Sequence, residues 1–156
     1  VSKNSGLSED TLEYLSNKAV TVVGGESVVS KADFDSIKEA VNKTNPVTRI
    51  AGENRQETNA KVISTFYAKN GFGDNTDVLV AKDGQRNKME LVDALTVSNL
   101  AALNNAPIVL ATNKLDKAQL NALELYGKNA NALYQVGHGV SLDVVKTLAN
   151  LLGLEK

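Results

Sequence analysis

The densest group of polar side chains in this chain is the segment RIAGENRQET at residues 49–58. Arg49 and Arg55 stand on either side of a glycine turn, where a strand-like pattern gives way to a helical one. Guanidinium groups near a helix N-terminus can hold phosphate or carboxylate groups through paired hydrogen bonds. Glu53 and Glu57 could instead neutralise both arginines within a salt-bridged helix cap. From these residues alone, an anion-binding site and a structural cap are equally open.

A second charged segment contains Lys82, Arg86 and Lys88 and follows the apolar run at residues 78–81. Ligands of open α/β sheets collect outside the carboxyl ends of the strands, which is where this loop is expected. Arginine matches phosphate and carboxylate groups with two parallel hydrogen bonds. The loop therefore favours an anionic ligand over a purely solvated surface.

Carboxylates in the same region offer a catalytic alternative. Asp83, Glu90 and Asp93 lie near the expected end of the same strand, and paired carboxylates can hydrolyse glycosides. Glu90 and Asp93 stand three residues apart on one predicted helix, however, and basic residues surround them. A charged, hydrogen-bonded helix start is therefore the favoured interpretation, and a glycan hydrolase is the alternative.

Other chemical signatures are missing from the sequence. Gly24 and Gly25 follow an apolar run, but the spacing fits neither the dinucleotide-binding pattern nor the P-loop, which favours a structural turn. His138 is the only histidine and cysteine does not occur, so thiolate metal sites and disulfides are excluded. No serine stands in a G-x-S-x-G elbow. We therefore expect no cofactor, no metal and no catalytic residues.

Short apolar runs alternate with helical patterns along the chain, and these elements must position the charged loops. The predicted strands span residues 19–23, 47–50, 77–82, 107–111 and 132–136. The predicted helices span residues 8–17, 30–41, 56–69, 89–103, 115–125 and 141–152. The strands are continuous apolar runs rather than alternating ones, which is typical of strands buried on both faces. The fold class is therefore α/β, with a mainly parallel sheet and helices on both faces.

One pattern occurs twice. Residues 20–30 and residues 133–141 both contain an apolar run, a glycine turn, a Val-Ser pair and then a helical stretch. The segment between them holds no third copy, and the separation exceeds the period of a thin solenoid. We interpret the chain as one full repeat plus the closing part of a preceding repeat, cut from a longer modular protein. The predicted division assigns residues 1–45 to the preceding repeat and residues 46–156 to the full one.

Composition narrows the class of partner. The 17 basic and 18 acidic residues give a formal net charge of −1, which argues against nucleic-acid binding. No apolar stretch approaches the length of about 20 residues that a membrane span requires. Neither nucleic acid nor membrane is an expected partner.

Five segments together resemble the type 2 cell wall-binding repeat of Gram-positive surface proteins. They are residues 49–58, Val78–Gly84, Leu91–Leu95, Ala106–Thr112 and Val136–Ser141, in the family's order. Asn54 and Gln56 depart from the Asp and Tyr that the family favours. The resemblance covers residues 47 to 152 as one repeat, while residues 19–41 match only the closing part.

The resemblance implies a noncatalytic module that anchors a surface-layer or cell-wall protein to an anionic secondary polymer of the wall. It also implies sets of three repeats in a pseudo-threefold arrangement, from sister repeats or a homo-oligomer, in an extracellular location. A purely structural packing element of the surface layer is a further alternative. The resemblance supplies five of the predicted ligand-binding residues, and charge and position supply the other three: Arg49, Arg55, Asp93, Ile108 and Leu110 from the family, and Lys82, Arg86 and Lys88 from charge.

Overall fold

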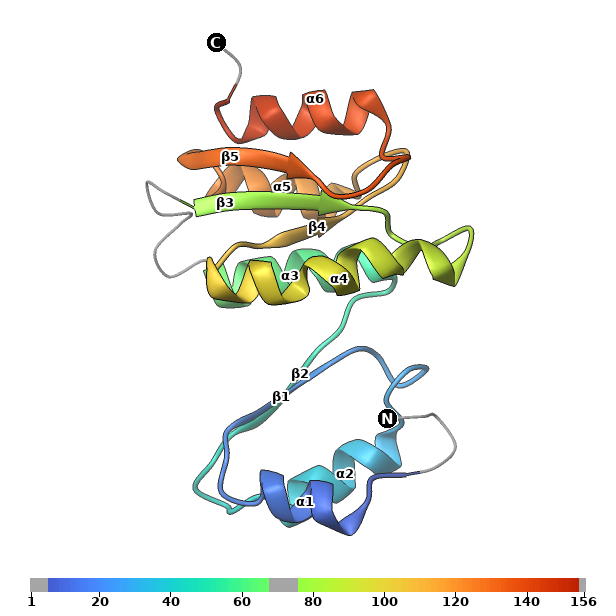
Figure 1. Cartoon of the computed structure of the whole chain (residues 1–156). Helices are drawn as coiled ribbons and strands as arrows, with labels where there is room; N and C mark the ends of the chain where they lie inside the picture. The colour runs from blue at the N-terminus through green and yellow to red at the C-terminus, as the bar shows by residue number, and fades with distance from the viewer. Residues whose placement is uncertain (1–5, 68–75, 155–156) are drawn as a thin grey trace. The chain divides into compact units, whose positions relative to one another are not determined.

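The structure is a computed structural model that describes residues 6–67 and 76–154, without the side chain of Lys88 (Figure 1). The chain folds as two compact units, residues 1–53 and residues 54–156. Each unit has its own parallel sheet and its own core.

The first unit contains α1 (Glu9–Leu15), β1 (Val20–Val23), α2 (Lys31–Ala40) and β2 (Val47–Ile50). The two strands pair in parallel over their whole length, with Val20 opposite Val47 and Val23 opposite Ile50. Because α2 connects two parallel neighbours, this unit is a complete strand–helix–strand crossover.

Apolar residues at helical and strand spacing build the core of the first unit. Val22, Ile37 and Val41 are buried, and leucines of α1 pack against them. The Ser30 hydroxyl caps α2 by accepting from the Asp33 amide at 3.0 Å. Such a cap contributes about 1 kcal/mol, and it fixes where the chain leaves the glycine turn for the helix.

The second unit is a three-stranded parallel sheet in the order β4-β3-β5, with helices packed around it (Figure 1). Its elements, in chain order, are α3 (Arg55–Tyr67), β3 (Thr76–Ala81), the 3-10 turn η1 (Lys88–Leu91), α4 (Val92–Leu103), β4 (Ile108–Leu110), α5 (Lys117–Tyr126), β5 (Ala130–Gln135) and α6 (Leu142–Leu151).

The central strand β3 is buried on both faces, which explains its unbroken run of apolar residues. Val78 and Val80 face a core shared with α3, α5 and α6. Leu79 points to the opposite face, where it packs in a smaller cluster with Ala101 of α4. The sheet is therefore covered on both faces, and the α/β class with parallel strands is confirmed.

Two features differ from the sequence expectation. The helix predicted over residues 89–103 begins as a 3-10 turn and becomes α-helical at Val92. The strands form two sheets, because β2 pairs with β1 and not with β3. The last two residues of the helix predicted over residues 56–69 lie outside the described part of the chain. The compact units divide after residue 53, whereas the repeat boundary at residues 45 and 46 remains a prediction about the sequence.

Candidate functional site

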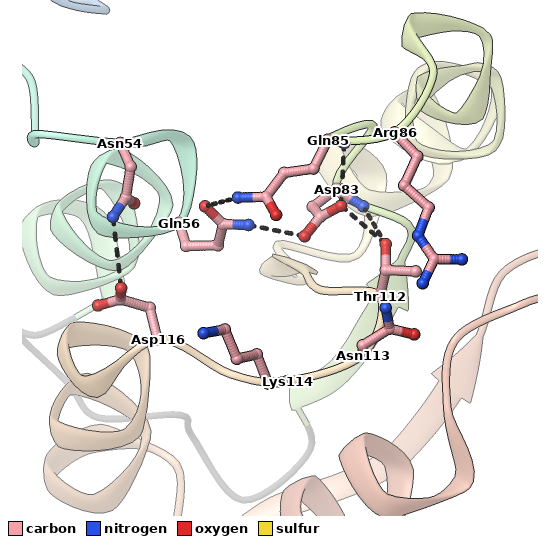
Figure 2. Close-up of a pocket in the computed structure, with 9 residues that line it drawn as sticks. All are labelled: Asn54, Gln56, Asp83, Gln85, Arg86, Thr112, Asn113, Lys114 and Asp116. Carbon is pink, nitrogen blue, oxygen red and sulfur yellow. Dashed lines mark hydrogen bonds between the residues drawn. The ribbon is translucent and has the colours of Figure 1, made fainter.

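The carboxyl ends of β3 and β4 open into a polar hollow of about 330 Å³ (Figure 2). It lies where open α/β sheets collect their ligands, outside the strand ends. Its walls are amide, hydroxyl and charged side chains from four loop or helix-start segments: Asn54, Gln56, Asp83, Gln85, Arg86, Thr112, Asn113, Lys114 and Asp116.

Asp83 is the buried centre of this hollow, with 3 % of its surface exposed. One carboxylate oxygen accepts from the amide of Gln56 at 2.6 Å. The other accepts from the hydroxyl of Thr112 at 2.7 Å and from the backbone amide of Gln85 at 3.1 Å. A buried carboxylate is tolerated only when such donors replace its water. Asp83 thus holds the loops after β3 and β4 together.

Two helix starts form one side of the hollow. The Asn54 side-chain oxygen caps α3 by accepting from the amide of Glu57 at 2.7 Å. Asp116 caps α5 in a capping box with Gln119. The side-chain amide of Asn54 donates to Asp116 at 3.4 Å, so the two caps are linked across the wall. The partial positive charge of both helix N-termini therefore adds to the field of the hollow.

Arg86 and Lys114 supply the full positive charges of the hollow. Both residues are exposed, and Figure 2 shows them extending from different sides of it, with Lys114 near Asp116 and Arg86 near Thr112. Within residues 6–67 and 76–154, the structure gives neither cation a hydrogen bond or ion pair. Their donors are available to a ligand.

Arg55, the first residue of α3, is close to this hollow but is already engaged. Its guanidinium donates to the backbone carbonyl of Asp83 and lies against Gly84. It thereby fixes the loop that carries Arg86. The geometry gives Arg55 a supporting position beside the hollow.

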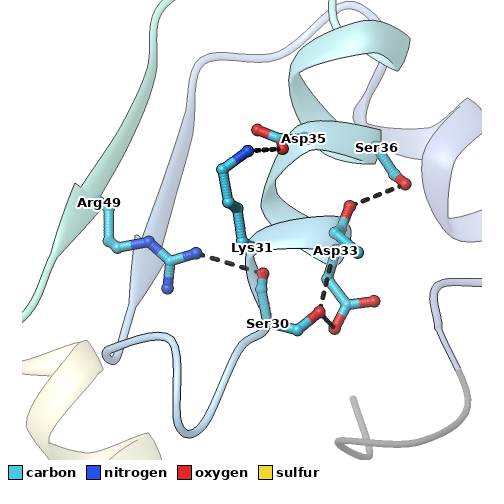
Figure 3. Close-up of polar contacts among 7 residues, drawn as sticks. Ser30, Lys31, Asp33, Asp35, Ser36 and Arg49 are labelled. Atoms are coloured by element: carbon cyan, nitrogen blue, oxygen red, sulfur yellow. Dashed lines mark hydrogen bonds and ion pairs between the residues drawn. The ribbon is translucent and has the colours of Figure 1, made fainter.

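Arg49 belongs to the other unit, where its guanidinium binds backbone carbonyls, and Figure 3 shows its bond to Ser30. It donates to the carbonyls of Gly24 at 2.7 Å, Val29 at 2.9 Å and Ser30 at 3.4 Å. The ring of Phe34 lies 4.5 Å from the guanidinium carbon. This geometry is that of a structural clamp within the first unit, whereas Arg55 belongs to the second unit.

The side chains of Lys82 and Asp93 contact the turn between β5 and α6. Lys82 forms an ion pair with Glu90 at 3.7 Å, and its stem packs against Gly139. The Asp93 carboxylate approaches Gly137 so closely that an added Cβ would lie 2.0 Å from its oxygen. Both side chains therefore sit beside a structural turn. The side chain of Lys88 lies outside the described part of the chain.

Ile108 and Leu110 lie on β4 and line a separate apolar groove of about 440 Å³ with residues of α3 and α4. Their backbone groups bind the Asn59 side chain, which accepts from Leu110 at 3.1 Å and donates to Ile108 at 2.8 Å. The seven predicted residues whose side chains the structure describes thus lie in several places. Among these seven, only Arg86 both lines the hollow and makes no hydrogen bond or ion pair.

The three carboxylates of the hydrolase alternative do not face one another across a cleft. Asp83 is fully engaged inside the hollow, whereas Asp93 contacts Gly137 and Glu90 contacts Lys82. Among the described residues, no group of three or more acidic, histidine or cysteine side chains could hold a metal ion. The same residues contain no helix that is both long and apolar enough to cross a membrane.

Most lining residues of the hollow escaped the sequence prediction. Asn54, Gln56 and Thr112 belong to the motifs of the family resemblance but not to the predicted ligand-binding residues, and Lys114 belongs to neither. The signal was present, because Thr112, Asn113 and Lys114 directly follow the apolar run of β4, just as Asp83 and Arg86 follow that of β3. Adjacent parallel strands end at the same edge, so these two loops must meet.

A family described as Cell wall binding domain 2 (CWB2) matches residues 49–145. The chain belongs to this family. The match begins at Arg49 on β2 and ends within α6, so it spans the end of the first unit and most of the second. The resemblance drawn from the five segments is thereby confirmed.

Two solved structures resemble the chain over nearly its whole length. Cwp8 from Clostridium difficile is 41% identical, with a TM-score of 0.87, and the similarity covers 97% of this chain and 24% of Cwp8. Cwp6 from Clostridium difficile is 28% identical, with a TM-score of 0.72, covering 97% of this chain and 23% of Cwp6. The chain therefore spans about a quarter of either protein. No curated protein sequence matches it.

CWB2 membership connects the chain with binding at the cell wall and with a cell-surface location. Since both solved relatives are several times longer, their complete activities and partners do not transfer to this chain.

Proposed function

We propose that this chain is a noncatalytic anchoring module that binds an anionic secondary polymer of the cell wall in the hollow at the strand ends. One observation carries the proposal: Arg86 and Lys114 border a polar hollow with unengaged donors, while the carboxylate at its centre is fully hydrogen-bonded. Cationic side chains with available donors, beside a lining whose carboxylate is already hydrogen-bonded, favour an anionic ligand that is rich in hydroxyl groups.

The engagement of the carboxylates favours binding without bond cleavage. A glycosidase of the usual kind needs one carboxyl group as acid and a second as nucleophile or base, across the scissile bond. Asp83 has hydrogen bonds to both of its oxygens, and Asp93 is turned to the β5–α6 turn. The proposal therefore assigns no catalytic residue and no cofactor.

A single hollow with two cations can grip a polymer only weakly. Exposed charge contacts contribute about 1 kcal/mol or less each. Several repeats on one protein, or several copies of the chain, would bind one polymer with far greater avidity. We propose sister repeats or a threefold homo-oligomer for this reason, at the cell wall or surface layer of the bacterium.

The exposed side of α4 supports packing of this kind. Leu95 and Leu103 have 71% and 85% of their surface exposed, and Met89 just before the helix has 70%. Large apolar side chains gathered on one exposed segment are typical of a surface that packs against another subunit.

The test measures the affinity of the chain for purified anionic wall polymer that is free of peptidoglycan. The affinity is determined by titration calorimetry at several salt concentrations. We expect affinity to fall as salt increases, because exposed charges are screened. The double variant Arg86→Met/Lys114→Met should lose about tenfold or more in affinity, corresponding to about 1.4 kcal/mol. The matched control Lys43→Met/Lys146→Met removes the same charge from exposed positions elsewhere and should bind like the parent.

Salt-independent binding, or equal affinity of the two double variants, would contradict an anion site in the hollow. Release of sugar fragments during the titration would instead favour the hydrolase alternative.

A further inference from the structure

The strand β5 leaves one edge of the sheet open. β5 pairs with β3 on one side, and within residues 6–67 and 76–154 no strand pairs with its other side. The amide of Val136 donates to the carbonyl of Val80 at 2.8 Å, so it faces β3. Because backbone groups alternate in direction along a strand, Tyr134 also faces β3, whereas Leu133 and Gln135 face outward.

The strand β1 is the counterpart of β5 in the first unit, and it pairs through the opposite edge. The duplicated pattern places Val20 opposite Leu133 in sequence alignment and Gly24 opposite Gly137. The amides of Val20 and Gly24 donate to carbonyls of the β2 segment at 2.9 and 2.8 Å. The positions that β1 uses to bind β2 are therefore the positions that β5 presents to solvent.

The surroundings of the two strands also correspond. Gly24 and Gly137 both have positive φ, at 125° and 72°. Ser30 and Ser141 both cap the following helix by accepting from the amide three residues later. The buried helix positions agree as well, with Ile37 and Val41 matched by Leu148 and Leu152. The geometry that receives β2 in the first unit is thus repeated around β5.

We infer that the outer edge of β5 is a docking site for the opening strand of a further repeat of this family, a segment of the same kind as Val47–Ile50. The strand would lie parallel to β5 and extend the order of the sheet to β4-β3-β5-strand. Addition of a strand to an exposed edge is a common mode of recognition, and it satisfies backbone groups that otherwise depend on water. The proposal concerns assembly of repeats and is independent of the polymer site.

The contacts of Arg49 in β2 predict which side chain the incoming strand should carry. Its guanidinium binds the carbonyls of Gly24, Val29 and Ser30. The matching carbonyls beside β5 are those at residues 137, 140 and 141. The Gln135 side-chain amide now donates to the first of these at 3.0 Å, the place that an incoming arginine would take. An arginine at the third position of the strand would therefore lock it in register.

The length of the α6 segment allows a direct experiment. Ser141 corresponds to Ser30 and Lys156 to Asn45, so residue 46 would follow Lys156 in the duplicated pattern. We would append a copy of residues 46–53 (PVTRIAGE) directly after Lys156 of the full chain. The tether places the strand at a millimolar effective concentration near β5. The matched control carries Thr48→Pro in the appended copy. Thr48 lies two residues from both Pro46 and Ile50, whose carbonyls face β1, so its amide faces the same side and proline removes that donor.

Hydrogen exchange, resolved by residue with NMR, is the readout. In the extended chain we expect the amides of Leu133 and Gln135 to exchange at least about tenfold more slowly than in the proline control. The amide of Tyr134, which already faces β3, should change little. An Arg49→Met substitution in the appended copy should restore part of the fast exchange.

Equal exchange at Leu133 and Gln135 in the extended chain and its control would overturn the proposal. Protection of these amides in the parent chain that grows with protein concentration would also overturn it, because β5 edges of two copies would then be each other's partners. Loss of polymer binding in the Arg86→Met/Lys114→Met variant, tested separately, affects neither outcome.

Discussion

The two units both place positive charge beside a parallel sheet, and they use it differently. In the first unit, the Arg49 guanidinium donates hydrogen bonds to three backbone carbonyls and lies over the ring of Phe34. In the second unit, Arg86 and Lys114 extend from loops beside a hollow and keep their donors. Carbonyl groups within reach, rather than the arginine itself, decide whether the charge is structural or available to a ligand.

The same comparison explains why the duplicated strand behaves in two ways. β1 is completed by β2 on the side where β5 is open. The first unit thus contains, in miniature, the interface that the second unit lacks within the described residues.

Of the substitutions considered, Arg49→Met should have the largest effect on stability, and this effect should be confined to the first unit. Methionine keeps the apolar stem but leaves the carbonyls at residues 24, 29 and 30 without their donor, and hydrogen bonds to charged groups are worth about 1.5–3 kcal/mol each. Because such contacts are not additive, we expect the first unit to lose about 3 kcal/mol. Hydrogen exchange of peptides from residues 20–41 should accelerate strongly, while peptides from residues 76–81 should not change.

The matched control for this experiment is Arg86→Met, which removes the same group from an exposed position. Surface substitutions of this kind change stability by less than about 0.5 kcal/mol. Equal destabilisation by the two substitutions would show that Arg49 is not a clamp.

The equivalent glycines Gly24 and Gly137 offer a second, smaller contrast. Both have positive φ, so alanine at either position strains the backbone, at a cost of about 1–3 kcal/mol. At Gly24 the new methyl group would make ordinary contact with Val28 at 3.4 Å, whereas at Gly137 it would collide with Asp93 at 2.0 Å. Gly137→Ala should therefore destabilise its unit by more than Gly24→Ala, measured by urea unfolding followed by hydrogen exchange.

A double variant separates the two causes. If the collision is real, Gly137→Ala/Asp93→Ala should be more stable than the sum of its single variants by about 1 kcal/mol. Simple additivity would mean that backbone strain accounts for the whole effect.

Much of the fold could be predicted, because each strand is a compact apolar run and each helix has a recognisable start. The helices predicted over residues 30–41, 115–125 and 141–152 begin at or next to Ser30, Asp116 and Ser141, and the structure places all three at N-caps. The pairing of β2 was harder to foresee. Asn45 and Pro46 end the helix pattern, so the sequence divides there, but burial of Ile50 ties the strand to the first unit.

The candidate site was only partly predictable. Lys82 and Arg86 are four residues apart, and both are basic residues of the same loop. Lys82 nevertheless pairs with Glu90, whereas Arg86 lines the hollow and is available to a ligand. The structural role of Arg49 depends on carbonyls 19 to 25 residues earlier in the chain, and no local sequence pattern predicts these partners. Hydrogen-bond partners of this kind are fixed by tertiary structure alone.

The exposed Lys31–Asp35 pair gives the smallest expected effect and completes the contrast with Arg49 (Figure 3). The hydrogen bond from Lys31 holds the pKa of the Asp35 carboxyl below its ordinary value of 3.8. A lowered folded-state pKa adds stability above the ordinary value, and this stability is lost as the pH falls through the lowered pKa. In water such a pair contributes little, so Lys31→Met should leave the urea midpoint at neutral pH unchanged within error. An NMR titration should show the pKa of Asp35 returning toward its ordinary value in this variant. An unshifted titration would mean that other groups, such as Lys38 or Arg49, set the charge state of Asp35, and the exposed pair would then be no counterpart to the partly buried clamp.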